Sequence, residues 1–187
     1  MKKLIQPIIL LLVLCVGINS AFGQKYFTKT GSVNFFSKTS LENIDATNKK
    51  ATCVIDSKTG QIEIALLMKA FEFEKALMQE HFNENYVESD KFPKATFKGN
   101  IINISSVNFT KDGTYPVDIT GKLTMHGVTK DMKTKGSIVV KNGKIQATTE
   151  FSVLLADYYI EIPSVVEDKI QKSIKISATL WLEQLAQ

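Results

Sequence analysis

Few side chains in this sequence are suited to catalysis or metal binding. The chain has two histidines, His81 and His126, and two cysteines, Cys15 and Cys53. A metal site needs three or four ligands, and these residues are far apart in the sequence. The patterns HExxH, CxxC, GxSxG and the phosphate-binding P-loop are also missing. We therefore predict no catalytic residues, no metal site and no enzymatic activity.

His126 is the histidine that most needs an interpretation, because it ends a regularly alternating stretch and directly precedes Gly127. It falls on the polar face of that stretch, so we interpret it as a turn residue held by a hydrogen bond. Two alternatives stay open: an acid/base role in a small-molecule enzyme, or a rim position that contacts a lipid head group. Cys53 lies in the apolar run ATCVI and is interpreted as a buried, unreactive thiol.

Apolar and polar residues alternate with a period of two over most of the chain, which is typical of β-strands with one buried face. The clearest segments are 32–37, 61–68, 94–101, 115–127, 144–153 and 173–184. Glycines at the ends of 58–60, 111–113 and 141–143 predict hairpin turns with positive φ. The pattern predicts an all-β fold, either an antiparallel sandwich or a barrel.

One segment departs from this alternation. Phe73, Ala76 and Leu77 have nearly helical spacing, which predicts a short helix around 74–82. We expect the helix to cap one end of a barrel, and packing on the outside is the alternative. Gly99 and Gly121 fall on inward faces, where they either leave room for a ligand or allow the strands to coil.

The first 23 residues have the features of a secretory signal peptide: Lys2 and Lys3, then an apolar run, then small residues around 21–23. We predict cleavage before Gln24 and a single mature domain over 24–187. A membrane anchor and lipoprotein processing at Cys15 are the alternatives. We expect export, to the periplasm or fully secreted, and no membrane span in the mature chain.

The basic residues are all lysine, without a single arginine, which argues against a nucleic-acid partner. The lysines are spread along the chain between apolar residues, as on the wet face of a sheet. The mature chain keeps one cysteine, so an intrachain disulfide is excluded and the core must stabilise the fold.

Two stretches, FPKATFKGNI (92–101) and VDITGKLTMHGVTKDM (117–132), closely resemble the signature of the YceI-like family. The second stretch carries the specific part, from Gly121 to Lys130. The resemblance extends over most of the mature chain, to about Leu182. The sequence departs from the family pattern at Leu154-Leu155-Ala156 and at Tyr159, which stands where relatives usually have Gly.

The resemblance implies an exported, lipocalin-like antiparallel β-barrel of about eight strands that encloses an elongated apolar cavity. It implies a polyisoprenoid or another long-chain lipid as the ligand and no other cofactor. Combined with the alternation, it predicts a cavity wall formed by Phe35, Ile64, Leu66, Phe97, Ile119, Leu123, Met125, Phe151, Val153, Ile176 and Leu180. A filled barrel that acts in envelope stress or beside a redox partner is the rival interpretation, and an exposed patch around Trp181 or Phe36 would favour it. A homodimer through edge strands requires an incompletely closed barrel.

Overall fold

The computed structural model describes residues 24–185, and the predicted signal peptide, residues 1–23, lies outside the described residues. Nine strands make up the described part: β1 (Lys25–Lys38), β2 (Asn43–Asp56), β3 (Gln61–Leu67), β4 (Phe71–Phe73), β5 (Lys94–Ile101), β6 (Gly113–Met125), β7 (Val128–Lys141), β8 (Lys144–Leu154) and β9 (Ser173–Gln184). No helix within residues 24–185 is long and apolar enough to cross a membrane.

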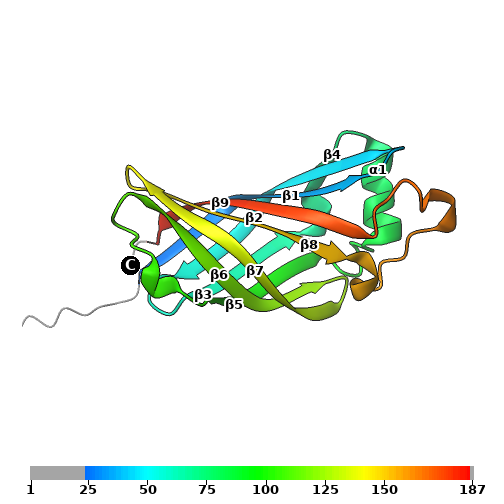
Figure 1. Cartoon of the computed structure of the whole chain (residues 1–187). Helices are drawn as coiled ribbons and strands as arrows, with labels where there is room; N and C mark the ends of the chain where they lie inside the picture. Colours follow the sequence, from blue (N-terminus) through cyan, green and yellow to red (C-terminus); the bar gives the residue numbers. More distant parts are fainter. Residues whose placement is uncertain (1–23, 186–187) are drawn as a thin grey trace, which may run out of the picture.

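Eight of these strands close into an antiparallel barrel in the order β1-β9-β8-β7-β6-β5-β3-β2, with β2 paired back to β1 (Figure 1). The short strand β4 adds to β2 at one end. The prediction of an all-β antiparallel barrel of about eight strands is therefore confirmed. The predicted strands are all present, but the alternation does not reveal β4, β7 or the first halves of β1 and β2.

The glycine positions correctly predict a positive φ at Gly60 (φ +77°), between β2 and β3, and at Gly143, between β7 and β8. A further hairpin, between β6 and β7, also turns through residues with positive φ. His126 (φ +51°) and Gly127 (φ +73°) form the two-residue loop between β6 and β7, and Asn142 and Gly143 form the loop between β7 and β8. Positive φ at both loop positions is the requirement of a type I′ turn, whose twist matches that of the strands. The prediction for Gly113 was wrong, because this residue opens β6 without a left-handed φ.

The predicted helix is present as α1 (Ala76–His81), followed by the π-helical turn η2 (Phe82–Tyr86). Both lie across one end of the barrel, together with the irregular segment 155–172 that carries the turns η4 (Leu155–Tyr158) and η5 (Ser164–Val166) (Figure 1). These elements cover only one end, so the two ends of the barrel differ.

The opposite end, which we call the packed half, is filled by side chains. Ile55 and Ile138 are 0% and 1% exposed there, and the rings of Tyr26 and Phe109 stack with centroids 4.7 Å apart. The turn η3 (Ile104–Ser106) inserts Ile104 into the same core. The described chain also begins and ends here, where the Leu185 N–H donates to the Lys25 carbonyl.

The cysteine that remains after residue 23 belongs to this core. Cys53 is buried on β2, and burial raises the pKa of its thiol to about 12. A thiol that ionises only at such high pH is a poor nucleophile. Its interpretation as an unreactive core residue agrees with this position.

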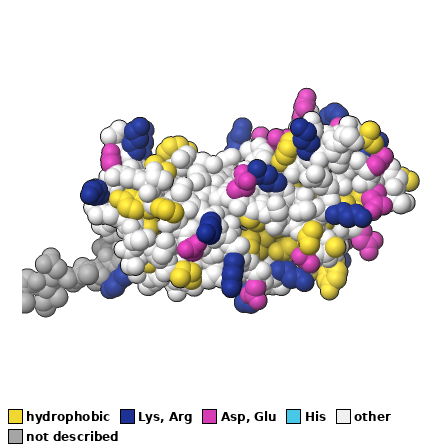
Figure 2. Space-filling model, viewed as in Figure 1, with side chains coloured by type: hydrophobic (Ala, Val, Ile, Leu, Met, Phe, Trp, Pro, Cys, Tyr) yellow, Lys and Arg dark blue, Asp and Glu magenta, His cyan; other side chains and the backbone are white. Residues whose placement is uncertain are grey.

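The strands β7 and β8 separate from one another in the other half of the barrel. Their ladder runs only from Gly136–Thr149 to Lys141–Lys144. At the point of separation, side chains replace the ladder: the Thr149 hydroxyl donates to the Lys135 carbonyl and the Thr134 hydroxyl to the Glu150 carbonyl. Hydrophobic side chains gather at the surface over this separation (Figure 2).

Candidate functional site

The half of the barrel beneath α1, which we call the open half, contains a cavity of about 260 Å³. Strand positions that alternate inward form its wall, among them Leu66 on β3, Leu123 and Met125 on β6, and Ile174 and Ile176 on β9. Nearly all of the lining side chains are apolar. Such a wall offers little to a polar solute and favours an apolar chain by removing it from water.

Four phenylalanines form the cover of the cavity. Phe82 packs with its ring centroid 5.3 Å from Phe35, 5.6 Å from Phe71 and 5.1 Å from Phe73. Phe35 also contacts Phe71 and Phe73, so the cluster joins β1, β4 and η2. Three of the four rings are only partly buried, since one side of the cluster faces the cavity.

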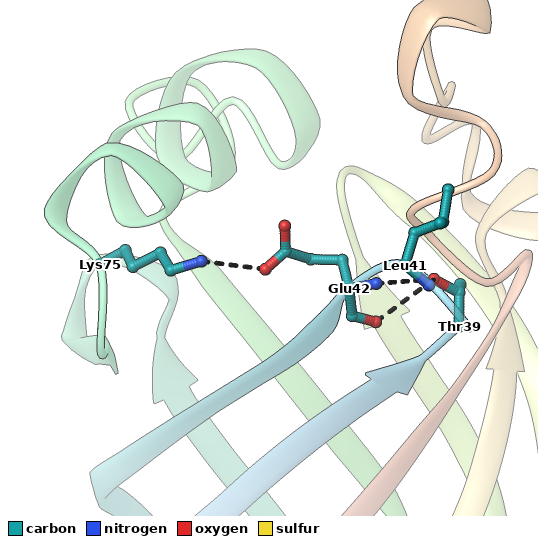
Figure 3. A network of polar contacts seen from close by, with 4 residues as sticks. All are labelled: Thr39, Leu41, Glu42 and Lys75. Atoms are coloured by element: carbon teal, nitrogen blue, oxygen red, sulfur yellow. Dashed lines mark hydrogen bonds and ion pairs between the residues drawn. The ribbon is translucent and has the colours of Figure 1, made fainter.

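The few polar residues of the wall all lie at the end of the cavity that we call the mouth: Ser37, Glu42, His81 and Lys169. Glu42 belongs to the β1–β2 hairpin, where the Thr39 hydroxyl accepts hydrogen bonds from the N–H groups of Leu41 and Glu42. Its carboxylate lies 3.0 Å from the Lys75 ammonium, just before α1 (Figure 3). This ion pair joins the hairpin to the helical cover across the mouth.

Six of the eleven residues predicted for the cavity wall lie in it: Phe35, Leu66, Leu123, Met125, Val153 and Ile176. The other five are not among the lining residues: Ile64, Phe97, Ile119, Phe151 and Leu180. Alternation identified the correct face but could not show how far along each strand the cavity extends.

Local packing accounts for two of these five. Leu180 lies in the packed half, where its Cδ2 fills the place of a side chain at Gly31. The ring of Phe97 lies over the two inward glycines: its Cζ would be 2.8 Å from a Cβ at Gly99 and 2.6 Å from one at Gly121. These glycines therefore make room for the ring of Phe97, and the space they leave is not available to a ligand.

His126 does not line the cavity, and both of its ring nitrogens are engaged. Nδ1 lies 2.8 Å from the Tyr158 carbonyl oxygen, and Nε2 lies 2.9 Å from the Glu88 carboxylate. Both partners accept, so the two bonds form together only when each nitrogen carries a proton. The hydrogen bond from His126 lowers the pKa of Glu88 below its ordinary value. A ring held in this way braces the hairpin and has no nitrogen left for acid/base chemistry.

The contacts of His126 fix three segments whose neighbouring residues do line the cavity. Met125 precedes it on β6, Val87 precedes Glu88, and Ile160 follows Tyr158 by two residues. Phe92 packs edge-on against the imidazole, with centroids 4.7 Å apart, and leaves no space for a side chain at Gly127. His126 thus acts on the cavity indirectly, by positioning its wall.

Tyr159 adds a strained residue to this arrangement. It has a left-handed φ of +54°, which costs about 1–2 kcal/mol in a residue with a Cβ. The resemblance to the YceI-like family expects Gly here, and the backbone conformation explains why a residue without a Cβ suits the position.

Many lining residues could not be found from alternation because they come from the cover. They include Met78 on α1, Phe82 and Tyr86 on η2, and Leu155, Ile160, Val166 and Ile170 from the segment 155–172. The available signal was the unusual apolar content of an irregular stretch, LLADYYIEIPSVV.

Among residues 24–185, no group of three or more histidine, cysteine or acidic side chains is arranged to hold a metal ion. The arrangement of the cavity suits binding of an apolar chain, with the mouth left for a polar end.

Comparison with known proteins adds the family. A sequence profile of the YceI-like domain matches residues 23–181. No curated protein matches the chain by sequence. A polyisoprenoid-binding domain from Saccharophagus degradans, implicated in plant cell wall breakdown, has a similar fold, with a TM-score of 0.76 and 14% identity over 88% of this chain and 100% of its own.

Two further solved structures share the fold. BcnA from Burkholderia cenocepacia has a TM-score of 0.67 and 14% identity, over 82% of this chain and 96% of its own. A YceI protein from Campylobacter jejuni has a TM-score of 0.57 and 15% identity, over 76% of this chain and 85% of its own.

Proposed function

The chain belongs to the YceI-like domain family, and from this premise we propose that it is a non-catalytic protein that binds a long-chain apolar ligand in its barrel. The ligand is a polyisoprenoid or a similar amphiphile. The observation that carries the proposal is the cavity of about 260 Å³ with a nearly wholly apolar wall in the open half. The similar fold from Saccharophagus degradans is described as a polyisoprenoid-binding domain, which supports the same class of ligand.

In this proposal, burial of the ligand's apolar chain supplies the binding affinity. Each methylene transferred from water contributes about 0.8 kcal/mol. A volume of 260 Å³ lies just below the roughly 300–1,000 Å³ of sites that enclose drug-sized ligands. A long ligand therefore places part of its chain between the phenylalanine cover and Leu123, and the remainder extends through the mouth.

The cavity favours ligand binding over the rival of a filled barrel that acts as an interaction protein. That rival requires packing throughout, whereas only one half of the barrel is filled. Trp181 is 55% exposed on β9, but Phe36 is partly buried. An enzyme using His126 is disfavoured because both ring nitrogens of His126 are engaged by Tyr158 and Glu88.

We further propose that the protein is exported and works in the periplasm, where a carrier can keep a lipid out of water between membranes. The sequence of residues 1–23 supports this with its short basic start, apolar run and small residues.

Native mass spectrometry of residues 24–187, purified from an exporting bacterial host, tests the function. The expected spectrum has a discrete added mass that organic solvent releases, or one that appears after incubation with isoprenoid alcohols and fatty acids. A bare polypeptide mass under both conditions would overturn the proposal.

A further inference from the structure

The polar residues at the mouth determine which head group a ligand can carry. Four polar side chains line an otherwise apolar wall: Ser37, Glu42, His81 and Lys169. A head group that leaves water there must find partners of opposite hydrogen-bonding character, since an unpaired polar group costs free energy on burial. The question is which of the four are free.

Glu42, the acidic residue of this set, is already engaged. Its carboxylate pairs with the Lys75 ammonium at 3.0 Å, and its side chain is 28% exposed (Figure 3). The pair cancels the negative charge of Glu42 and leaves the wall without a free carboxylate.

The remaining three side chains all offer hydrogen-bond donors. Ser37 is 1% exposed, and its oxygen accepts the Gln171 N–H at 2.9 Å. Its hydroxyl proton has no acceptor among the residues the structure describes. Lys169, two residues before Gln171, has no carboxylate within 4.0 Å in the same part of the chain. His81 faces the mouth from α1 and makes no side-chain hydrogen bond to another described residue.

Free donors together with one free ammonium select an oxygen-rich, negatively charged head group. Charge-assisted hydrogen bonds to a carboxylate or phosphate are about twice as strong as neutral ones. Lys169 and Ser37 lie on the same side of the mouth, because the Gln171 N–H anchors the segment of Lys169 to Ser37 at the end of β1.

The surrounding charge limits how negative that head group can be. The three segments around the mouth, 38–44, 72–86 and 155–172, contain nine acidic residues and four lysines: Glu42, Glu72, Glu74, Glu80, Glu84, Asp157, Glu161, Glu167 and Asp168 against Lys38, Lys75, Lys169 and Lys172. Ions screen these charges beyond about 8 Å, but near the mouth they oppose each added negative charge. Lys75 and Lys172 are paired with Glu42 and Glu167, and of the two other lysines, Lys38 and Lys169, only Lys169 lines the cavity. One unpaired lysine of the wall in an acidic setting matches a carboxylate better than a phosphate, which carries about −1.5 to −2.

We propose that the ligand is a long-chain carboxylate, with its apolar chain in the cavity and its carboxylate at the mouth, paired with Lys169 and hydrogen-bonded by Ser37. This rests on the proposed lipid-binding function and adds the chemistry of the head group to it.

Three probes with the same chain test the head group: palmitate, hexadecanol and hexadecyl phosphate, each titrated into delipidated mature protein. The wild-type protein is expected to bind palmitate about tenfold more tightly than hexadecanol, and hexadecyl phosphate no more tightly than palmitate. Lys169→Gln should abolish the preference for palmitate over hexadecanol.

Lys172→Gln is the matched control. Lys172 lies in the same segment but pairs with Glu167 at 2.7 Å and does not line the cavity, so its replacement should keep the tenfold preference. Equal binding of all three probes, or a preference that survives Lys169→Gln, would overturn the carboxylate assignment and leave lipid binding intact. Failure of every probe to bind would overturn the carboxylate assignment, and the proposed function falls with it when isoprenoid alcohols also fail to bind.

Discussion

The two halves of the barrel are built from the same strands but serve different purposes. In the packed half, Ile55, Ile138 and the Tyr26–Phe109 stack leave little free space. In the open half, the inward residues of β3, β6, β8 and β9 face a cavity, and phenylalanines from β1, β4 and η2 cover it. A continuous alternation of apolar residues thus builds a stabilising core at one end and a binding surface at the other.

The two halves differ in how completely side chains from the connecting segments and strands fill the interior of the barrel. In the packed half, hairpin connections such as η3 insert side chains into the core, and Leu180 fills the place left by Gly31. In the open half, two long connections, 74–93 and 155–172, lie over the end of the barrel (Figure 1). Phe97, resting on Gly99 and Gly121, marks the boundary between the two.

The largest expected difference between the halves is in the free energy of unfolding. Ile138→Ala in the packed half should lower it by about 3–5 kcal/mol, because the surrounding core cannot collapse into the space. Ile176→Ala should cost about 1–2 kcal/mol, since Ile176 already borders a cavity and is only partly buried. Urea titration of both variants measures this. Equal losses would show that the open half contributes as much packing as the other half.

Filling the cavity should separate binding from stability. Leu66→Trp places an indole in the open half and should weaken binding of a long-chain lipid at least a hundredfold, with a change in unfolding free energy below about 1.5 kcal/mol. Leu67→Trp is the matched control, because Leu67 is the next residue and is 50% exposed. Titration of both variants with the same lipid checks this. Similar affinity in the two variants would place the ligand elsewhere.

The contacts of His126 should stabilise the open half specifically. His126→Asn keeps a residue that tolerates positive φ but cannot reach both Tyr158 and Glu88, so we expect a loss of about 1.5–3 kcal/mol. Hydrogen exchange of the variant should rise in 87–93 and 155–160 and stay unchanged around Ile55. Uniform loss of protection in both halves would contradict a local bracing role.

The smallest expected effects concern pH, and they arise at both ends. Hydrogen bonds from the backbone N–H groups of Thr59 and Lys58 lower the pKa of Asp56 in the packed half, and the hydrogen bond from His126 lowers that of Glu88 in the open half. A carboxyl whose pKa is lowered on folding contributes stability above its unfolded pKa, and this is lost as the pH falls through its folded value.

Asp56→Asn and Glu88→Gln should therefore each flatten the decline of stability below about pH 4, near the ordinary values of 3.8 and 4.5. Urea titrations at a series of pH values measure the slope. Unchanged slopes in both variants would remove these two carboxylates as causes of acid destabilisation.

The sequence predicted most of the barrel because β-strands with one buried face alternate between apolar and polar residues. It also predicted the turn role of His126, which follows from its place before Gly127. Five expected wall residues were misplaced, and the cover residues Met78, Phe82 and Ile170 were missed, because the depth of a cavity depends on contacts between distant segments. The pattern of one strand also cannot show whether a glycine leaves empty space or is covered by a neighbouring ring, as Gly121 is covered by the ring of Phe97.

The central claim is that the open half holds an apolar chain. A crystal structure of residues 24–187 saturated with geranylgeraniol, with binding verified in solution, tests this most directly. Continuous density for the chain is expected between the phenylalanine cover of Phe35, Phe73 and Phe82 and the wall at Leu123 and Met125. An empty open half, or a chain bound on the outer surface of the barrel, would contradict the account.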